Sequence, residues 1–154
     1  MAGSKMSAEP RSISLKAIGT VINGIHEPPE GGWSEVTSDI VIAPGLAESL
    51  DNLDEFSHII VLFWMHRAID REPKRVHPMG NRGLPLVGLF ASRSPYRPNP
   101  LGKTTVRLLG RRGNTLKVRG LDAVDGTPVV DIKPYIPGYD TAAEAKVPPW
   151  VTEQ

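Results

Sequence analysis

Short runs of branched and aromatic residues, separated by glycine and proline, recur along most of the chain and limit the folds that it can adopt. Such runs are typical of β-strands, and the breaks between them carry turn residues. We expect strands at residues 13–22, 38–43, 58–67, 86–92, 104–110 and 115–121, with a last strand after a turn at Asp125 and Gly126. A short helix is expected only at residues 47–56. The pattern predicts a mainly β fold, a single small antiparallel β-barrel with little helix.

The length of 154 residues fits one domain, whose barrel we place at residues 13–140. Residues 1–12 are polar and small and are expected to form a disordered leader, and residues 141–154 a C-terminal tail. The chain has no cysteine, which excludes disulfides and thiolate metal sites. Because no segment has the pattern of a signal peptide or a membrane span, we expect a cytoplasmic protein with no membrane partner.

The stretch SRSPYRPNPLG, residues 92–102, combines three prolines with two arginines. Proline fixes its own φ and restricts the residue before it, so this loop is stiff before any ligand arrives. We expect it to follow the C-terminal end of the strand at residues 86–92. A stiff loop with guanidinium groups suits a carboxylate or phosphate ligand, and a rigid turn with two solvated arginines is the alternative.

Charge is divided unevenly along the chain. Residues 67–119 hold thirteen lysines and arginines against two acidic residues, whereas the segments before and after are acidic. A basic region of this kind favours a polyanion such as nucleic acid, and mutual neutralisation of the segments in the fold is the alternative. The predicted hairpin turn RRGN places Arg111 and Arg112 among the candidate RNA contacts.

Several familiar motifs are absent. The letters GKTT at residues 102–105 resemble the end of a P-loop, but Arg97 stands where its first glycine is required. No GxGxxG sequence supports a Rossmann dinucleotide site. The four histidines have no metal-ligand spacing, so we expect no metal, and His58 and His66 fall eight residues apart on one predicted strand.

Three blocks of the chain resemble the tRNA methyltransferase O family, also called TsaA-like proteins: LDEFSHIIVLFWMHR (53–67), FASRSPYRPNPLG (90–102) and LDAVDGTPVVDIKPYIPGYD (121–140). The resemblance implies a small β-barrel that binds S-adenosyl-L-methionine outside a Rossmann fold. It also implies a homodimer that methylates N6 of threonylcarbamoyladenosine beside the anticodon of tRNA. Bacterial members carry a further C-terminal domain, whereas this chain ends at Gln154, which puts the identity of the acceptor in doubt.

The resemblance also implies positions for the site. The cofactor-binding residues it implies are His66, Arg67, Arg93, Leu101, Asp122, Asp125, Gly126 and Thr127, and a looser match adds Glu30, Gly31 and Gly32. As residues that contact the substrate we select Tyr96, Arg97, Asn99 and Tyr135, the tyrosines as stacking partners for a base. The alternative for Asp122 and Asp125 is that these carboxylates cap their own hairpin turn. The alternative for both tyrosines is that they are core or interface residues. A methyltransferase for another acceptor and a non-catalytic S-adenosyl-L-methionine or nucleic-acid binding module remain the rival functions.

Overall fold

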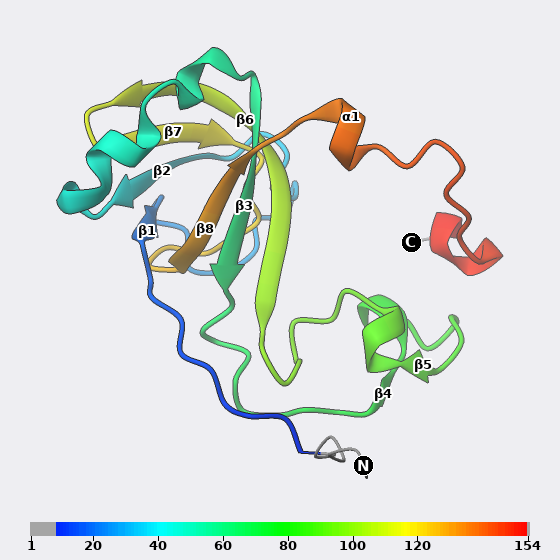
Figure 1. Cartoon of the computed structure of the whole chain (residues 1–154). Coiled ribbons are helices and arrows are strands. Elements are labelled where there is room, and N and C mark those ends of the chain that lie inside the picture. The colour runs from blue at the N-terminus through cyan, green and yellow to red at the C-terminus, as the bar shows by residue number, and fades with distance from the viewer. Residues whose placement is uncertain (1–8, 154) are drawn as a thin grey trace, which may run out of the picture.

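The structure, a computed structural model, describes residues 9–153. A closed barrel has the strand order β1-β2-β7-β6-β3-β8, and β4 and β5 form a separate two-stranded sheet. The strands are β1 (Gly19–Ile22), β2 (Thr37–Ile42), β3 (His58–Trp64), β4 (Arg75–Val76), β5 (Val87–Gly88), β6 (Leu101–Arg112), β7 (Thr115–Arg119) and β8 (Pro128–Pro134). Figure 1 shows the small sheet standing apart from the barrel. The predicted antiparallel barrel with little helix is confirmed.

Helical structure is limited to single turns. The 3₁₀ helices are η1 (Pro44–Leu50), η2 (Leu53–Glu55), η3 (Pro78–Gly80), η4 (Leu89–Ala91) and η5 (Pro149–Glu153), and α1 (Pro137–Asp140) is one α-helical turn. The helix expected at residues 47–56 is instead η1 and η2, because Asn52 between them takes a left-handed φ of 71°. Within residues 9–153, no helix has the length and the apolar run that crossing a bilayer requires.

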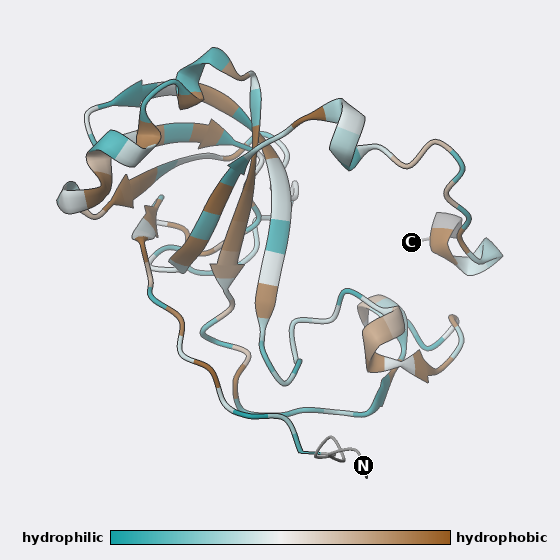
Figure 2. Ribbon diagram, in the orientation of Figure 1, coloured by the Kyte–Doolittle hydropathy of each residue, from teal (hydrophilic) through white to brown (hydrophobic). Residues whose placement is uncertain are grey.

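Alternation along the strands fills the barrel with apolar side chains. Val106 and Leu108 of β6 face inward and are buried, as are Ile59 and Val61 of β3. Burying each such side chain typically contributes roughly 1.5–3 kcal/mol. Figure 2 shows β3 strongly hydrophobic, whereas much of β6 is pale or hydrophilic. The outward positions of β6 therefore present a polar surface.

Strand boundaries differ from those expected wherever a pairing partner ends. The strand expected at residues 13–22 begins only at Gly19, because β2 pairs no farther than Ile42 opposite it and β8 no farther than Val129. Residues 1–8 of the expected leader lie outside the described residues, and residues 9–17 are exposed without regular structure. The strand expected at residues 58–67 ends at Trp64, so His66 lies beyond it and does not share a strand with His58.

The region before the proline-rich loop is the largest departure from the expected fold. Of the strand expected at residues 86–92, only Val87–Gly88 pairs, and it pairs with β4 outside the barrel. The chain then turns through η4, where the Ser92 hydroxyl donates to the Leu89 carbonyl at 2.7 Å. The proline-rich loop therefore does not follow a barrel strand but leads into β6.

Antiparallel order brings distant segments together at one end of the barrel. Because all neighbouring strands run in opposite directions, β1, β3 and β7 end where β2, β6 and β8 begin. We call this the site end. The opposite end, which we call the helix end, carries η1, η2 and the β6–β7 turn.

Candidate functional site

A cavity at the site end collects several of the residues that the sequence singled out. It has a volume of about 340 Å³ and is lined by Phe63, Met65, Arg93, Arg97, Leu101, Gly102, Lys103, Thr104 and Asp122. This cavity thus brings together three residues implied for the cofactor. Arg93 and Asp122 come from loops, and Leu101 comes from β6. The inward alternation of β6 places Gly102 and Thr104 beside them.

Arg93 and Asp122 give this cavity two opposite charges. The Arg93 side chain is exposed, and within residues 9–153 it makes no hydrogen bond or ion pair. Asp122 accepts a hydrogen bond from the Thr104 hydroxyl, which fixes the direction of its carboxylate. A free guanidinium and an oriented carboxylate suit a zwitterionic ligand, such as an amino acid with its carboxylate and ammonium groups. Thr104 was missed by sequence reasoning, since only the register of β6 places it here.

At Gly102 the Phe63 ring occupies the space that a side chain would need. A Cβ atom at this position would lie 2.4 Å from two ring carbons of Phe63, whose side chain is buried. Contacts that short require the ring to move. The cavity floor is therefore the β6 backbone packed directly against an aromatic ring, with no space between them for a side chain.

His66 supplies a polar atom without a partner. Its Nδ1 is buried and, among the described residues, finds no hydrogen-bond partner. A buried polar group of this kind is rare in folded proteins, and a ligand is one ordinary way to satisfy it. The next residue, Arg67, donates to the His26 carbonyl and lies 3.5 Å from a Glu27 carboxylate oxygen. Arg67 therefore ties the β1–β2 loop to the end of β3.

The residues from Asp125 to Thr127 hold loops in place. One Asp125 oxygen accepts from the backbone N–H groups of Asn23 at 2.8 Å and Gly24 at 2.9 Å. These N–H groups, that of Gly24 first, lower the pKa of the Asp125 carboxyl from its ordinary value of 3.8. Asp125 therefore caps the β1–β2 loop and not its own turn, and its contact with a cofactor stays a prediction.

The two residues after Asp125 complete the expected turn. Gly126 has a φ of 83°, which favours glycine, and the buried Thr127 hydroxyl donates to the Val124 carbonyl at 2.6 Å. Sequence reasoning missed Asn23, whose side-chain amide donates to the Ser38 hydroxyl and to the Ala123 carbonyl. Asp125, Gly126 and Thr127 do not line the cavity described above, and their contact with a cofactor stays a prediction.

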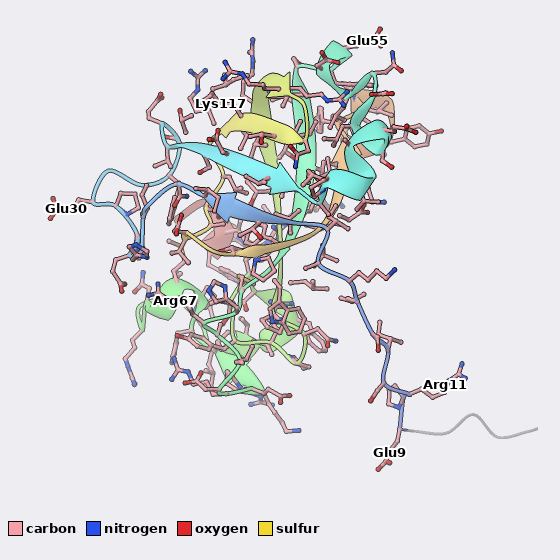
Figure 3. All side chains as sticks on the ribbon, turned by 90° about the vertical axis from the view of Figure 1, so that its left-hand side faces the viewer. Glu9, Arg11, Glu30, Glu55, Arg67 and Lys117 are labelled. Carbon is pink, nitrogen blue, oxygen red and sulfur yellow. The ribbon has the colours of Figure 1, made fainter. Side chains whose placement is uncertain are left out.

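Glu30, Gly31 and Gly32 do not join the cavity. All three are exposed, and a φ of 80° at Gly32 marks a turn in the β1–β2 loop. Figure 3 shows Glu30 at the outer tip of this loop, away from Arg67. Their role in holding a cofactor stays a prediction that the geometry of the cavity does not support.

The selected substrate residues are divided between several places. Arg97 lines the cavity, but its guanidinium donates to the Ser92 and Ser94 carbonyls at 2.8 and 3.1 Å, so it stiffens its own loop. The Tyr96 ring is covered by the Arg71 guanidinium 4.0 Å away. Both residues therefore already have partners inside the protein.

The other two selected residues lie farther from the cavity. Asn99 lines an apolar groove on the outside of the barrel. Tyr135 follows β8 at the helix end, where its ring lies 6.3 Å from that of His58 and its hydroxyl lies 3.2 Å from that of Thr141. The structure does not bring Tyr135 to the site end.

Comparisons with known proteins place this chain among described relatives. The family model for the tRNA-methyltransferase O N-terminal domain matches residues 23–141. A "Probable S-adenosyl-L-methionine-binding protein" of Archaeoglobus fulgidus is 42% identical over 139 residues, which is 88% of this chain and 37% of that protein. A protein of the same description from Methanothermobacter thermautotrophicus is 47% identical over 114 residues, which is 74% of this chain and 80% of that protein.

Solved structures show the same fold. The crystal structure of TrmO from Pseudomonas aeruginosa superposes with a TM-score of 0.72 at 33% identity, covering 88% of this chain and 61% of that one. This chain thus spans less than two thirds of that structure and little more than a third of the Archaeoglobus protein. The match to the family model, over residues 23–141, covers most of the sequence. The chain therefore belongs to the family of the tRNA-methyltransferase O N-terminal domain.

Proposed function

We propose that the protein is an S-adenosyl-L-methionine-dependent tRNA methyltransferase that modifies N6 of threonylcarbamoyladenosine beside the anticodon. The observation that carries this proposal is the cavity at the site end of the barrel, which both Arg93 and Asp122 line. Membership of the tRNA-methyltransferase O family and the described binding of S-adenosyl-L-methionine by the two archaeal relatives support it.

The residues present fit this cofactor. Arg93 would pair with the carboxylate of its methionine part, and Asp122, held by Thr104, would accept from its amino group or a ribose hydroxyl. The unpaired His66 Nδ1 would take a further hydrogen bond, and Leu101 would cover an apolar face. When bound, S-adenosyl-L-methionine supplies a methyl group on a sulfonium, a good leaving group. The protein's part is to align the acceptor nitrogen and to exclude water.

The acceptor is proposed as tRNA because the cavity opens among basic side chains. Lys103 lines it, and the region from residue 67 to residue 119 is strongly basic. A nucleoside in an anticodon loop is exposed and can be drawn into a pocket at modest cost. An acceptor of this kind would place the protein in the cytoplasm.

We also propose a homodimer. An apolar groove of about 430 Å³ runs along the outside of the barrel, lined by Ile13, Leu15, Lys16, Ala17, Trp64, Asn99, Leu101, Pro128 and Val130. Ile13 is 81% exposed and Leu15 50%, which is unusual for neighbouring large apolar side chains. Leu101 lines both this groove and the cavity, so a second copy seated here would border the cofactor site. Light scattering that finds only monomer at micromolar concentration would overturn this proposal.

One transfer assay tests the function. Purified protein, S-adenosyl-L-methionine with a labelled methyl group, and total tRNA from a bacterial strain without a tRNA-methyltransferase O gene are incubated together. The tRNA is then digested to nucleosides and analysed by mass spectrometry. We expect label in threonylcarbamoyladenosine, and at least about tenfold less label at a subsaturating cofactor concentration when Arg93→Ala replaces the wild type.

Each other outcome points to a rival. Label in a different nucleoside would leave a tRNA methyltransferase with another acceptor. Cofactor binding by calorimetry without transfer to any RNA would indicate a binding module. Neither binding nor transfer would overturn the proposal.

A further inference from the structure

Two arginines face each other on the outer surface of the barrel. Arg107 of β6 is the register partner of Arg119 of β7. Their neighbours Leu108 and Val118 are buried inside, so the alternation of the strands directs both arginines outward, and both are exposed. Cβ atoms of directly opposed residues lie about 4.5–5.5 Å apart, and like charges at that separation oppose folding.

Other basic residues on the barrel strands are neutralised by carboxylates. Lys117 lies 3.5 Å from an Asp39 oxygen, Lys133 lies 3.0 Å from an Asp131 oxygen, and Arg111 lies 2.8 Å from an Asp51 oxygen. Within residues 9–153, no ion pair forms at Lys103, Arg107, Arg112 or Arg119. All four lie on β6 and β7. The unpaired positive charge of the barrel is therefore concentrated on one pair of strands.

The surface between these strands is also hollowed. The register of β6 against β7 shifts between Leu108 and Gly110, an irregularity that increases the local twist. A depression of about 480 Å³ follows, lined by Asp39, Leu109, Gly110, Arg111, Arg112, Thr115 and Lys117. Of the four unpaired basic residues, Arg112 lines this depression.

We infer that the outer face of β6 and β7, through Lys103, Arg107, Arg119 and Arg112, binds the sugar-phosphate backbone of the RNA acceptor. The inference rests on the proposed function, which supplies an RNA. Lys103 also lines the cofactor cavity, and the four residues of strand from Lys103 to Arg107 span about 13 Å. The face therefore continues from the cavity along the barrel. Phosphates relieve the repulsion between the two arginines and release counterions as they bind.

This assignment corrects one expected RNA contact. Arg111 was expected to reach the RNA with Arg112, but it donates to the Asp51 carboxylate and to the Ala47 and Gly113 carbonyls. It is therefore committed to the fold, and only Arg112 remains available at the turn.

The test compares matched neutral substitutions. Binding of total tRNA to the 154-residue protein is measured by filter retention from 50 to 300 mM KCl for wild type, K103Q, R107Q/R119Q and K133Q. We expect R107Q/R119Q to bind about tenfold or more weakly and to lower the slope of log affinity against log salt by about 2, and K103Q to lower it by about 1. K133Q removes one positive charge from β8, two strands away, and should keep the wild-type slope.

Two further readouts separate this inference from the proposed function. The affinity of R107Q/R119Q for S-adenosyl-L-methionine, measured by calorimetry, should be unchanged because neither arginine lines the cavity. Its melting temperature should be unchanged or higher, since the variant removes a repulsion. If the double variant melts lower than wild type, the salt slopes of R107Q and R119Q alone decide.

Three results would overturn it. If R107Q/R119Q binds and methylates tRNA as well as the wild type does, this face does not bind RNA, and the proposed function is unaffected. An equal loss in K133Q would show that net charge alone matters. No tRNA binding by the wild type would remove the RNA acceptor and this face together.

Discussion

Two arginines at opposite ends of the barrel are used in opposite ways. At the helix end, Arg111 spends its guanidinium on the Asp51 carboxylate and on two backbone carbonyls, and it is only 19% exposed. At the site end, Arg93 is exposed and makes no such bond within the described residues. One arginine holds a loop to the barrel, and the other is kept free. In this fold, an arginine therefore indicates a binding site only where its guanidinium has no partner within the protein.

The cause of this difference lies in what each end connects. At the helix end, η1 and η2 follow β2 closely and pack beside the β6–β7 turn, so donors and acceptors find each other locally. At the site end, the connection from β3 to β6 leaves the barrel to form the β4–β5 sheet (Figure 1). The proline-rich loop that returns there leaves the Arg93 guanidinium at the cavity without a partner among the described residues.

The largest effect is expected from Gly102→Ala, which tests whether the site end is as rigid as the core beneath it. The new Cβ would overlap the buried Phe63 ring at 2.4 Å, and overpacking of this kind should destabilise the protein by about 3 kcal/mol. Urea unfolding measures the change. Gly88→Ala is the matched control, because its Cβ would meet nothing within 4 Å, and it should be nearly neutral. Equal stability of the two variants would show that the cavity floor yields.

Next in size is the effect of Arg93→Ala on the cofactor. Loss of a charge-assisted hydrogen bond should weaken S-adenosyl-L-methionine binding by about 1.5–3 kcal/mol, with no change in unfolding free energy. Arg82→Ala is the control, because Arg82 is exposed and lines none of the cavities described above. Calorimetry measures both. Unchanged affinity in Arg93→Ala would remove the contrast between the two ends.

Sequence reasoning reached the barrel because its signals are local. The hairpin at RRGN needs a positive φ, which Gly113 supplies with 60°, and the turn at Asp125 and Gly126 is found as expected. Both ends of most barrel strands also carry the glycine and proline that mark them. The fold class therefore followed from short-range chemistry.

What the sequence could not predict depends on register and on competition for partners. Thr104 meets Asp122 only because β6 begins at Leu101 and faces its even-numbered residues inward. Arg97 has the same side chain as Arg93, but its guanidinium donates to two carbonyls of its own loop. The apolar run at residues 86–92 has the pattern of a barrel strand, but within the described residues its paired part, β5, pairs with β4. Such outcomes are set by tertiary contacts that no window of sequence contains.

A smaller effect is expected at the helix end from Arg111→Ala. Its guanidinium is mostly buried and satisfies three oxygens, so its loss should destabilise the protein by about 1–2 kcal/mol. Arg112→Ala, the adjacent but exposed position, should change the unfolding free energy by less than about 0.5 kcal/mol. Thermal unfolding compares the two. If Arg112 proves the more important for stability, the division between a structural and a free arginine is wrong.

The smallest effect concerns Asp125→Asn, which asks whether the site end holds its β1–β2 loop by charge or by shape. Asparagine keeps an oxygen for the N–H groups of Asn23 and Gly24 but removes the negative charge that they stabilise. Because those N–H groups lower the pKa of Asp125 in the folded protein, the charge contributes stability that is complete above the ordinary value of 3.8 and disappears as pH falls through the lowered pKa. Asp125→Asn should therefore melt below wild type at pH 7 and approach it as the pH falls below the ordinary value of 3.8. Asp54→Asn, at an exposed position on η2, should show no such convergence. A gap between Asp125→Asn and wild type that stays constant with pH would mean that the shape of the amide, and not the lost charge, loosens the loop.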